Sequence, residues 1–205
     1  MNKKELEKVI KKRIRDQSKN YQYKPMSSSF YFVEGDYLID CNIIVYKIGK
    51  SFDLGAKFRI KPLFVDDLFW EVFGMESNKN APFSLRVNGA FSFRPTLAEF
   101  HRERLNSLEL EKQVTVIIRR LLEFSKEIVN SFKSFDDFYN YATKKSNIGL
   151  FDPKLYLMIN NIKDGNFYKA LKLAQEELNQ GRSGDFENEG KNIYEWVVEY
   201  CKERL

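Results

Sequence analysis

The side chains that most often carry out catalysis are scarce in this chain. Its 205 residues include a single histidine, His101, and two cysteines, Cys41 and Cys201. A zinc site built from histidine and cysteine needs about four ligands, and a nucleophile activated by a base needs both partners side by side. The sequence therefore predicts a protein that binds a molecule without transforming it, and that uses no metal and no cofactor.

Three titratable residues near the middle of the chain, Glu99, His101 and Glu103, come closest to a catalytic or metal-binding group. Thr96 followed by Glu99 is a capping box, which predicts a helix that begins near Leu97. Side chains two positions apart on a helix point about 200° away from each other, so His101 would face away from both glutamates. We interpret His101 as a surface or interface histidine.

Carboxylate chemistry is the remaining enzymatic alternative. A metal-dependent nuclease of the restriction type needs clustered carboxylates and a lysine that orients water. Asp40 and Asp53 lie on predicted strands, but the third strand continues as Lys57-Phe58-Arg59-Ile60-Lys61, without the required acid. The pairs Asp66-Asp67 and Asp136-Asp137 stand at predicted helix starts, where the helix dipole favours negative charge. An enzyme that uses carboxylates alone is therefore the weakest functional hypothesis.

Alternation with a period of two predicts a sheet in the first half of the chain. The predicted strands are Phe30–Glu34, Tyr37–Lys47, Ser51–Lys61 and Ser84–Arg94. In the last of them, Leu85 and Val87 would face the core. About four antiparallel strands with one polar face follow from this pattern. The predicted polar face does not interleave exposed aromatic side chains among its cations, as a base-stacking platform would require.

Basic residues give the clearest sign of a binding surface. The segment Met1–Lys24 holds nine lysines or arginines against three acids, a local charge of +6 in a chain whose net charge is +5. Its helical periodicity predicts an amphipathic helix over 3–17, with lysines opposite the apolar residues. The candidate binding residues are Lys8, Lys11 and Lys12 on this helix, and Lys57, Arg59, Lys61, Arg86 and Arg94 on the polar face of two predicted strands.

The rest of the chain is predicted to be helical. Capping signals and periodicity indicate helices that begin near Leu97, Phe135 and Lys154, and helices over 110–132, 166–180 and 191–205. The predicted class is α+β, with an N-terminal helix, a sheet and a C-terminal half of about five helices. Residues 1–95 would form the helix and sheet, and 96–205 a helical region packed on them, as two regions or as one continuous domain.

The pattern over Met1–Arg94 predicts a helix, a hairpin and Phe-rich strands. Within it lie two short sequence segments, Lys61-Pro62-Leu63-Phe64 and Ser84-Leu85-Arg86-Val87-Asn88-Gly89. In this layout the chain resembles small uncharacterised bacterial domains, some of which are suspected immunity proteins encoded beside toxins. The resemblance implies a non-catalytic role in binding a partner protein.

Two functional hypotheses follow. The first is a non-catalytic bacterial binding protein, in its narrow form an immunity protein that recognises a toxin. The alternative is a nucleic-acid-binding protein that uses the basic N-terminal helix and the Lys/Arg sheet face. The longest apolar runs, Ile43–Tyr46 and Val116–Ile118, are far below the ~18 residues that cross a bilayer, and no apolar leader follows Met1. We therefore expect a cytoplasmic protein without a membrane partner, in which both cysteines are thiols.

Overall fold

The chain forms two compact units, each made of two separate segments. Unit 1 contains Met1–Lys61 and Pro95–Ser146, and unit 2 contains Pro62–Arg94 and Asn147–Leu205. The computed structural model describes residues 2–87, 96–106, 108–145 and 152–205, with side chains for all of these except 96–102 and 145. The sequence predicts the regions 1–95 and 96–205, or one continuous domain; in the structure each unit takes one segment from either side of residue 95 or close to it.

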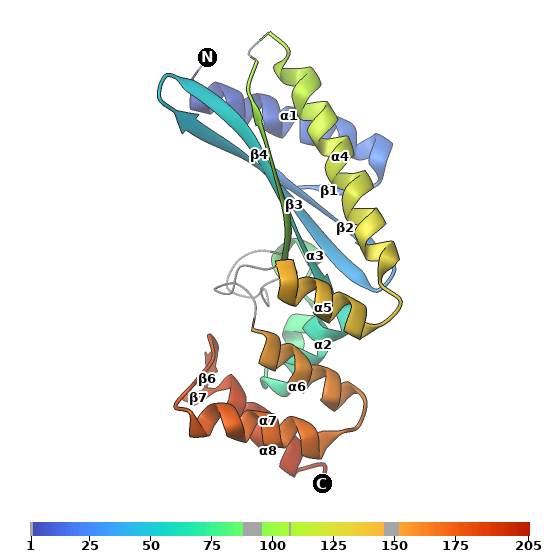
Figure 1. Ribbon diagram of the computed structural model, residues 1–205, viewed down its shortest axis with the longest axis vertical. Coiled ribbons are helices and arrows are strands. Elements are labelled where there is room, and N and C mark those ends of the chain that lie inside the picture. Colours follow the sequence, from blue (N-terminus) through green and yellow to red (C-terminus); the bar gives the residue numbers. More distant parts are fainter. Residues whose placement is uncertain (1, 88–95, 107, 146–151) are drawn as a thin grey trace. The chain divides into compact units, whose positions relative to one another are not determined.

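Unit 1 is built on a five-stranded antiparallel sheet with the strand order β1-β2-β3-β4-β5 (Figure 1). The strands are β1 (Lys24–Pro25), β2 (Ser29–Glu34), β3 (Tyr37–Ile48), β4 (Ser51–Pro62) and β5 (Thr96–Arg104). Gly35 and Gly49 close the two central hairpins with φ of +55° and +60°, a conformation that glycine adopts without strain. The bounds of β2, β3 and β4 differ from the predicted ones by one residue at most.

Helices α1 (Lys3–Tyr21) and α4 (Leu110–Ser131) cover one face of this sheet (Figure 1). The alternate residues that face them are buried. The ring of Phe58 on β4 meets the ring of Phe124 on α4 edge to face, with the centroids 5.8 Å apart. Helix α1 is fixed by three buried residues and by the Tyr23 hydroxyl, which donates to the carbonyl of Ile14 at 2.6 Å. A third helix, α5 (Phe135–Lys145), contacts β5.

The predicted helix that begins near Leu97 is wrong. Thr96–Arg104 forms strand β5, which pairs with β4 so that His101 lies opposite Ala56. A capping box satisfies only the backbone donors of one helical turn, whereas the strand satisfies a ladder of backbone groups along β4. Glu99, His101 and Glu103 therefore occupy alternate positions of a strand.

The predicted strand over Ser84–Arg94 is also wrong over 84–87, the part of it that the structure describes. Ser84–Arg86 belongs to the short helix α3 (Phe83–Arg86), and residues 88–94 lie outside the described residues. Leu85, which the alternation places in the core, is 48% exposed, although Val87 is buried as predicted. Residues two apart share a face in a strand but point in different directions in a helical turn, so Leu85 and Val87 do not both face the core.

Unit 2 is helical and has an aromatic core. Its elements are α2 (Leu63–Val72), η1 (Glu76–Asn80), α3, α6 (Pro153–Lys163), α7 (Phe167–Asn179), β6 (Glu187–Asn188), β7 (Lys191–Asn192) and α8 (Ile193–Lys202). Phe69, Phe73 and Phe186 stack or meet edge to face. Gly74 has φ +70°, and a Cβ there would lie 2.9 Å from the Trp196 ring, so glycine lets the aromatic core close.

The architecture is α+β, as the sequence predicts. Cys41 and Cys201 are both buried and free. Within the described ranges, no helix combines the length and the apolar character that crossing a bilayer requires.

Candidate functional site

The face of the sheet opposite α1 and α4, here called the outer sheet face, carries polar and aromatic side chains. The register pairs Tyr31 with Asp40, and alternation along β3 and β4 continues this face. Its partly exposed members are Tyr31, Val33, Asn42, Ile44, Tyr46, Lys57 and Arg59. Sequence reasoning missed the two tyrosines, which lie on β2 and β3 and not on the strand that carries Lys57 and Arg59.

An ion pair between Asp40 and Arg59 joins β3 and β4 on this face. Arg59 Nη2 on β4 donates to Asp40 Oδ2 on β3. Asp40 is 1% exposed, whereas the Arg59 side chain keeps 23% of its surface in solvent. In the described part of the chain, neither Asp40 Oδ1 nor Arg59 Nε has a hydrogen-bond partner. Both of these atoms are buried, so a partner cannot reach them, but the guanidinium is oriented by a buried carboxylate and part of the Arg59 side chain stays exposed.

Burial raises the pKa of Asp40, although the neighbouring Arg59 acts in the opposite direction. The folded state therefore holds the Asp40 proton more tightly than the unfolded chain does. The stability that this group contributes is fully present below the ordinary carboxyl pKa, and it is lost as the pH rises through the raised value.

We expect the wild type to gain stability relative to the Asp40→Asn variant as the pH is lowered from about 7 towards about 4. The asparagine cannot titrate, so the difference between the two unfolding free energies isolates Asp40 from the other carboxyl groups. Urea unfolding of both proteins at several pH values measures this difference. A difference that stays constant over the range, or that moves in favour of asparagine on acidification, would contradict the assignment.

Two predicted site residues lie on β4 beside Arg59, and they differ in exposure. Lys57 is partly exposed on the outer sheet face, with Asn42 and Ile44 on the neighbouring strand. Lys61, at the end of β4, is fully buried and makes a contact of its own. Of the three cations predicted on this strand, only Lys57 and Arg59 are therefore accessible to a partner.

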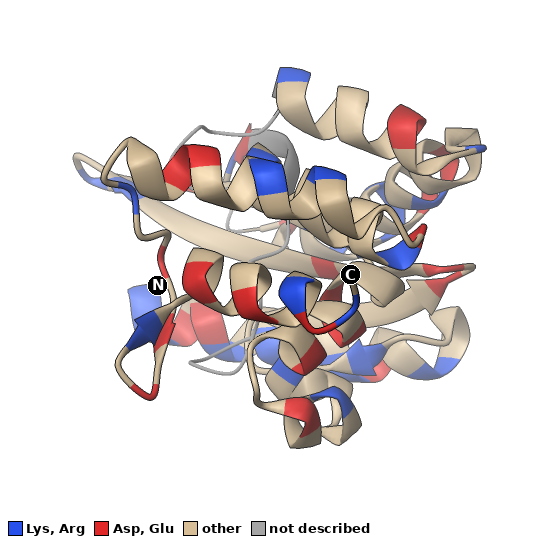
Figure 2. Ribbon diagram, turned by 90° about the horizontal axis from the view of Figure 1, so that it is seen from below, with Lys and Arg blue, Asp and Glu red and all other residues tan. Residues whose placement is uncertain are grey.

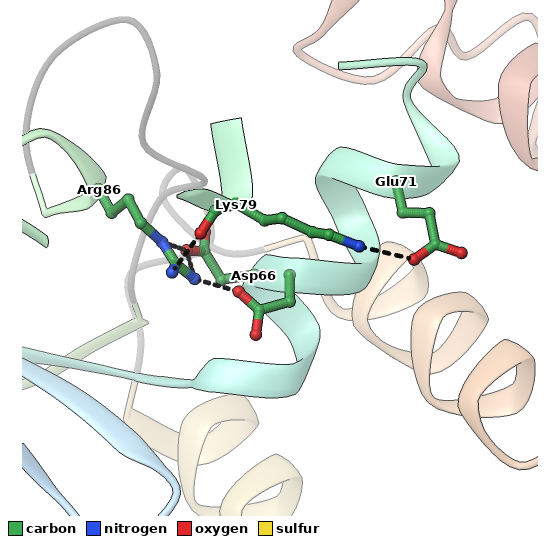
Figure 3. Close-up of polar contacts among 5 residues, drawn as sticks. Asp66, Glu71, Lys79 and Arg86 are labelled. Atoms are coloured by element: carbon green, nitrogen blue, oxygen red, sulfur yellow. Dashed lines mark hydrogen bonds and ion pairs between the residues drawn. The ribbon is translucent and has the colours of Figure 1, made fainter. Parts of the chain in front are cut away.

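Arg86 lies in unit 2 and is buried among carboxylates (Figure 3). Its Nε donates to Asp66 Oδ2 at 2.6 Å, and its Nη2 donates to Asp67 Oδ1. Nη1 donates to the carbonyl of Lys79 at 3.0 Å, while the Lys79 side chain reaches Glu71 at 3.3 Å. Arg86 therefore forms a buried structural ion pair, and it lies on helix α3 and not on a strand as the sequence predicts.

The other predicted binding residues are Arg94 and the three lysines of α1. Arg94 lies outside the described residues. Lys8, Lys11 and Lys12 are exposed on α1, which covers the sheet face opposite Lys57 and Arg59 (Figure 1). The predicted binding residues therefore fall on separate surfaces. Elsewhere, both basic and acidic residues occur along the helices, as Figure 2 shows.

No cluster of three His, Cys, Asp or Glu side chains suited to a metal ion occurs among the described residues. Glu103 instead accepts a hydrogen bond from Arg120 on α4 at 2.7 Å. The described carboxylates mostly pair with cations or cap helices. The outer sheet face can thus offer hydrogen bonds, apolar contact and one oriented guanidinium to a partner.

Neither a family model, nor a curated protein, nor a solved structure matches this chain.

Proposed function

We propose that this chain is a non-catalytic binding protein that recognises a partner protein through the outer sheet face of unit 1. The observation that supports this most is the Arg59 guanidinium, which is oriented by the buried Asp40 and lies on the face that also carries Tyr31. Tyrosine and arginine are the residue types that most often dominate protein interfaces, because they combine a large contact area with directed hydrogen bonds. An arginine that is already held in place loses little conformational freedom on binding.

The charge of this face also favours a protein partner over a phosphate backbone. Asp40 offsets Arg59, and Asp53, whose side chain is largely buried on β4, lies 4.0 Å from Arg104. Among the outer-face residues whose side chains the structure describes, Lys57 adds one further cation, so the excess of positive charge there is small. A surface that neutralises phosphates needs several uncompensated cations. The hypothesis that the Lys/Arg sheet face binds nucleic acid therefore has little support.

The narrow form of the proposal makes the partner a toxin and this chain its immunity protein. It rests on the resemblance in layout, of which the N-terminal helix and the hairpins of β2, β3 and β4 are present in unit 1. The product of the gene next to this one is the natural first partner to test.

A photo-crosslinking experiment tests the use of the outer sheet face. A benzophenone amino acid is placed at Val33, on this face, or at Phe124, on the helical side of unit 1; the exposed fractions of the two side chains are 40% and 41%. We expect a discrete adduct with one protein from position 33 and none from position 124, and we expect the Arg59→Ala change to weaken rebinding of that purified protein. Equal adducts at both positions, or none at position 33, would contradict the proposal.

A further inference from the structure

Helix α1 carries a continuous row of cations along its exposed side. At about 100° per residue, six of them fall within an arc of about 100°. All six are exposed, and in the described part of the chain none forms an ion pair. This α1 cationic stripe consists of Lys4, Lys8, Lys11, Lys12, Arg15 and Lys19.

The acids of α1 lie beside the stripe, and two of them are already engaged. Glu5 closes the capping box by accepting from the backbone nitrogen of Asn2 at 2.8 Å. Glu7 pairs with Lys3, with Nζ and Oε1 3.8 Å apart. Neither acid forms an ion pair with a cation of the stripe, and Asp16 is the one other acid on this helix.

Packing against the rest of unit 1 fixes the side of α1 that carries the stripe. Leu6, Ile10 and Ile14 are fully buried on the opposite side of α1, and Arg13 forms an ion pair with Glu111 on α4. From Lys4 to Lys19 the helix rises about 22 Å, at about 1.5 Å per residue. That length corresponds to about six nucleotide steps of a duplex, at about 3.4 Å each.

We propose that the α1 cationic stripe binds the phosphate backbone of double-stranded nucleic acid. Six uncompensated cations in a row can neutralise several phosphates and release their counterions, which supplies most of non-specific binding. The stripe contains no aromatic side chain on which an unpaired base could stack, so a duplex fits better than a single strand, and no sequence preference is expected. This surface is separate from the outer sheet face and goes beyond the partner-binding role.

An anionic membrane is the other large polyanion, and the structure favours it less. A helix that lies on a bilayer buries its apolar side between the lipids. The apolar side of α1 is instead occupied by the core of unit 1, since Leu6, Ile10 and Ile14 have no exposed surface. Vesicle binding is therefore expected to be weaker than duplex binding.

The test uses the full chain and a fluorescently labelled DNA duplex of about 20 base pairs, an RNA duplex of the same length, and vesicles with and without phosphatidylserine. We expect duplex binding that weakens by roughly two to three orders of magnitude between about 50 and about 200 mM salt if four to six phosphates are contacted. Duplexes of different sequence should bind about equally. The triple variant Lys8→Gln/Lys11→Gln/Lys12→Gln should weaken binding roughly tenfold or more and lower the salt slope by about three.

The matched control is Lys144→Gln/Lys169→Gln/Lys172→Gln, which removes the same charge from exposed helical positions elsewhere. Glutamine and lysine have similar helix propensities, so both variants should keep the wild-type circular dichroism and melting temperature. Duplex binding that is lost only in the α1 variant supports the proposal. Equal weakening in both variants, absence of duplex binding at low salt, tighter binding to vesicles, or a preference for single strands would overturn it.

Discussion

Replacing Arg86 with methionine should lower the free energy of unfolding of the full chain by about 3–5 kcal/mol. Arg86 and Asp66 are both buried, and the Arg86 Nε lies 2.6 Å from Asp66 Oδ2. Methionine has a similar length but no charge, so Asp66 would remain as a buried carboxylate without its guanidinium. The carbonyl of Lys79 would also lose a donor. Urea unfolding of the two proteins measures the loss.

Removing the other half of the pair provides the control for this prediction. In the double variant Arg86→Met/Asp66→Asn, the buried carboxylate is also removed, and Asp67, which loses its cation, is about half exposed, so we expect a large part of the lost stability to return. The Asp67→Asn variant should lose much less, because the Asp67 side chain is about half exposed and water screens its charge. An Arg86→Met protein within about 1 kcal/mol of the wild type would show that the ion pair is not important for stability.

The central strands could be predicted because their signals are local. Alternation over Ser51–Lys61 coincides with β4, and Gly49 marks the preceding turn. The strand β5 could not be predicted in this way. Its sequence alternates weakly, and its partner β4 lies more than 30 residues earlier in the chain, so the pairing is a tertiary effect. The capping box at Thr96 was the strongest local signal there, and it indicated the wrong element.

In the candidate site, too, local sequence patterns predict some features, whereas others depend on residues far apart in the chain. Alternation along β4 placed Lys57 and Arg59 on one face, and the structure agrees. The pairing of Arg59 with Asp40, and the presence of Tyr31 on the same face, depend on the register between three strands. The tight turns at Gly35 and Gly49 fix which residues of the neighbouring strands pair, so this part of the site could have been predicted from the sequence. The carboxylate partners of Arg86 lie about 20 residues away on another helix, and no local pattern indicates them.

The Phe58→Ala variant is expected to lose about 3–5 kcal/mol of unfolding free energy. Phe58 is buried on the inner face of β4, where its ring meets Phe124 edge to face. Truncation removes this ring contact and also leaves a cavity that the strands and helices around it can fill only in part. Urea unfolding with fluorescence and circular dichroism as two probes measures the loss and tests whether the transition stays cooperative.

The Phe124→Ala variant is the matched control, because it removes the same ring-to-ring contact from the other side. Phe124 is 41% exposed, so its truncation opens the site to water and leaves no closed cavity. We expect it to cost about 1–2 kcal/mol, close to the value of an aromatic pair together with partial burial. The difference between the two losses of unfolding free energy then measures the cost of the cavity that Phe58→Ala leaves beneath the outer sheet face. Equal losses in both variants would mean that Phe58 does not fill a close-packed core, and the assignment of the inner face of β4 would have to be abandoned.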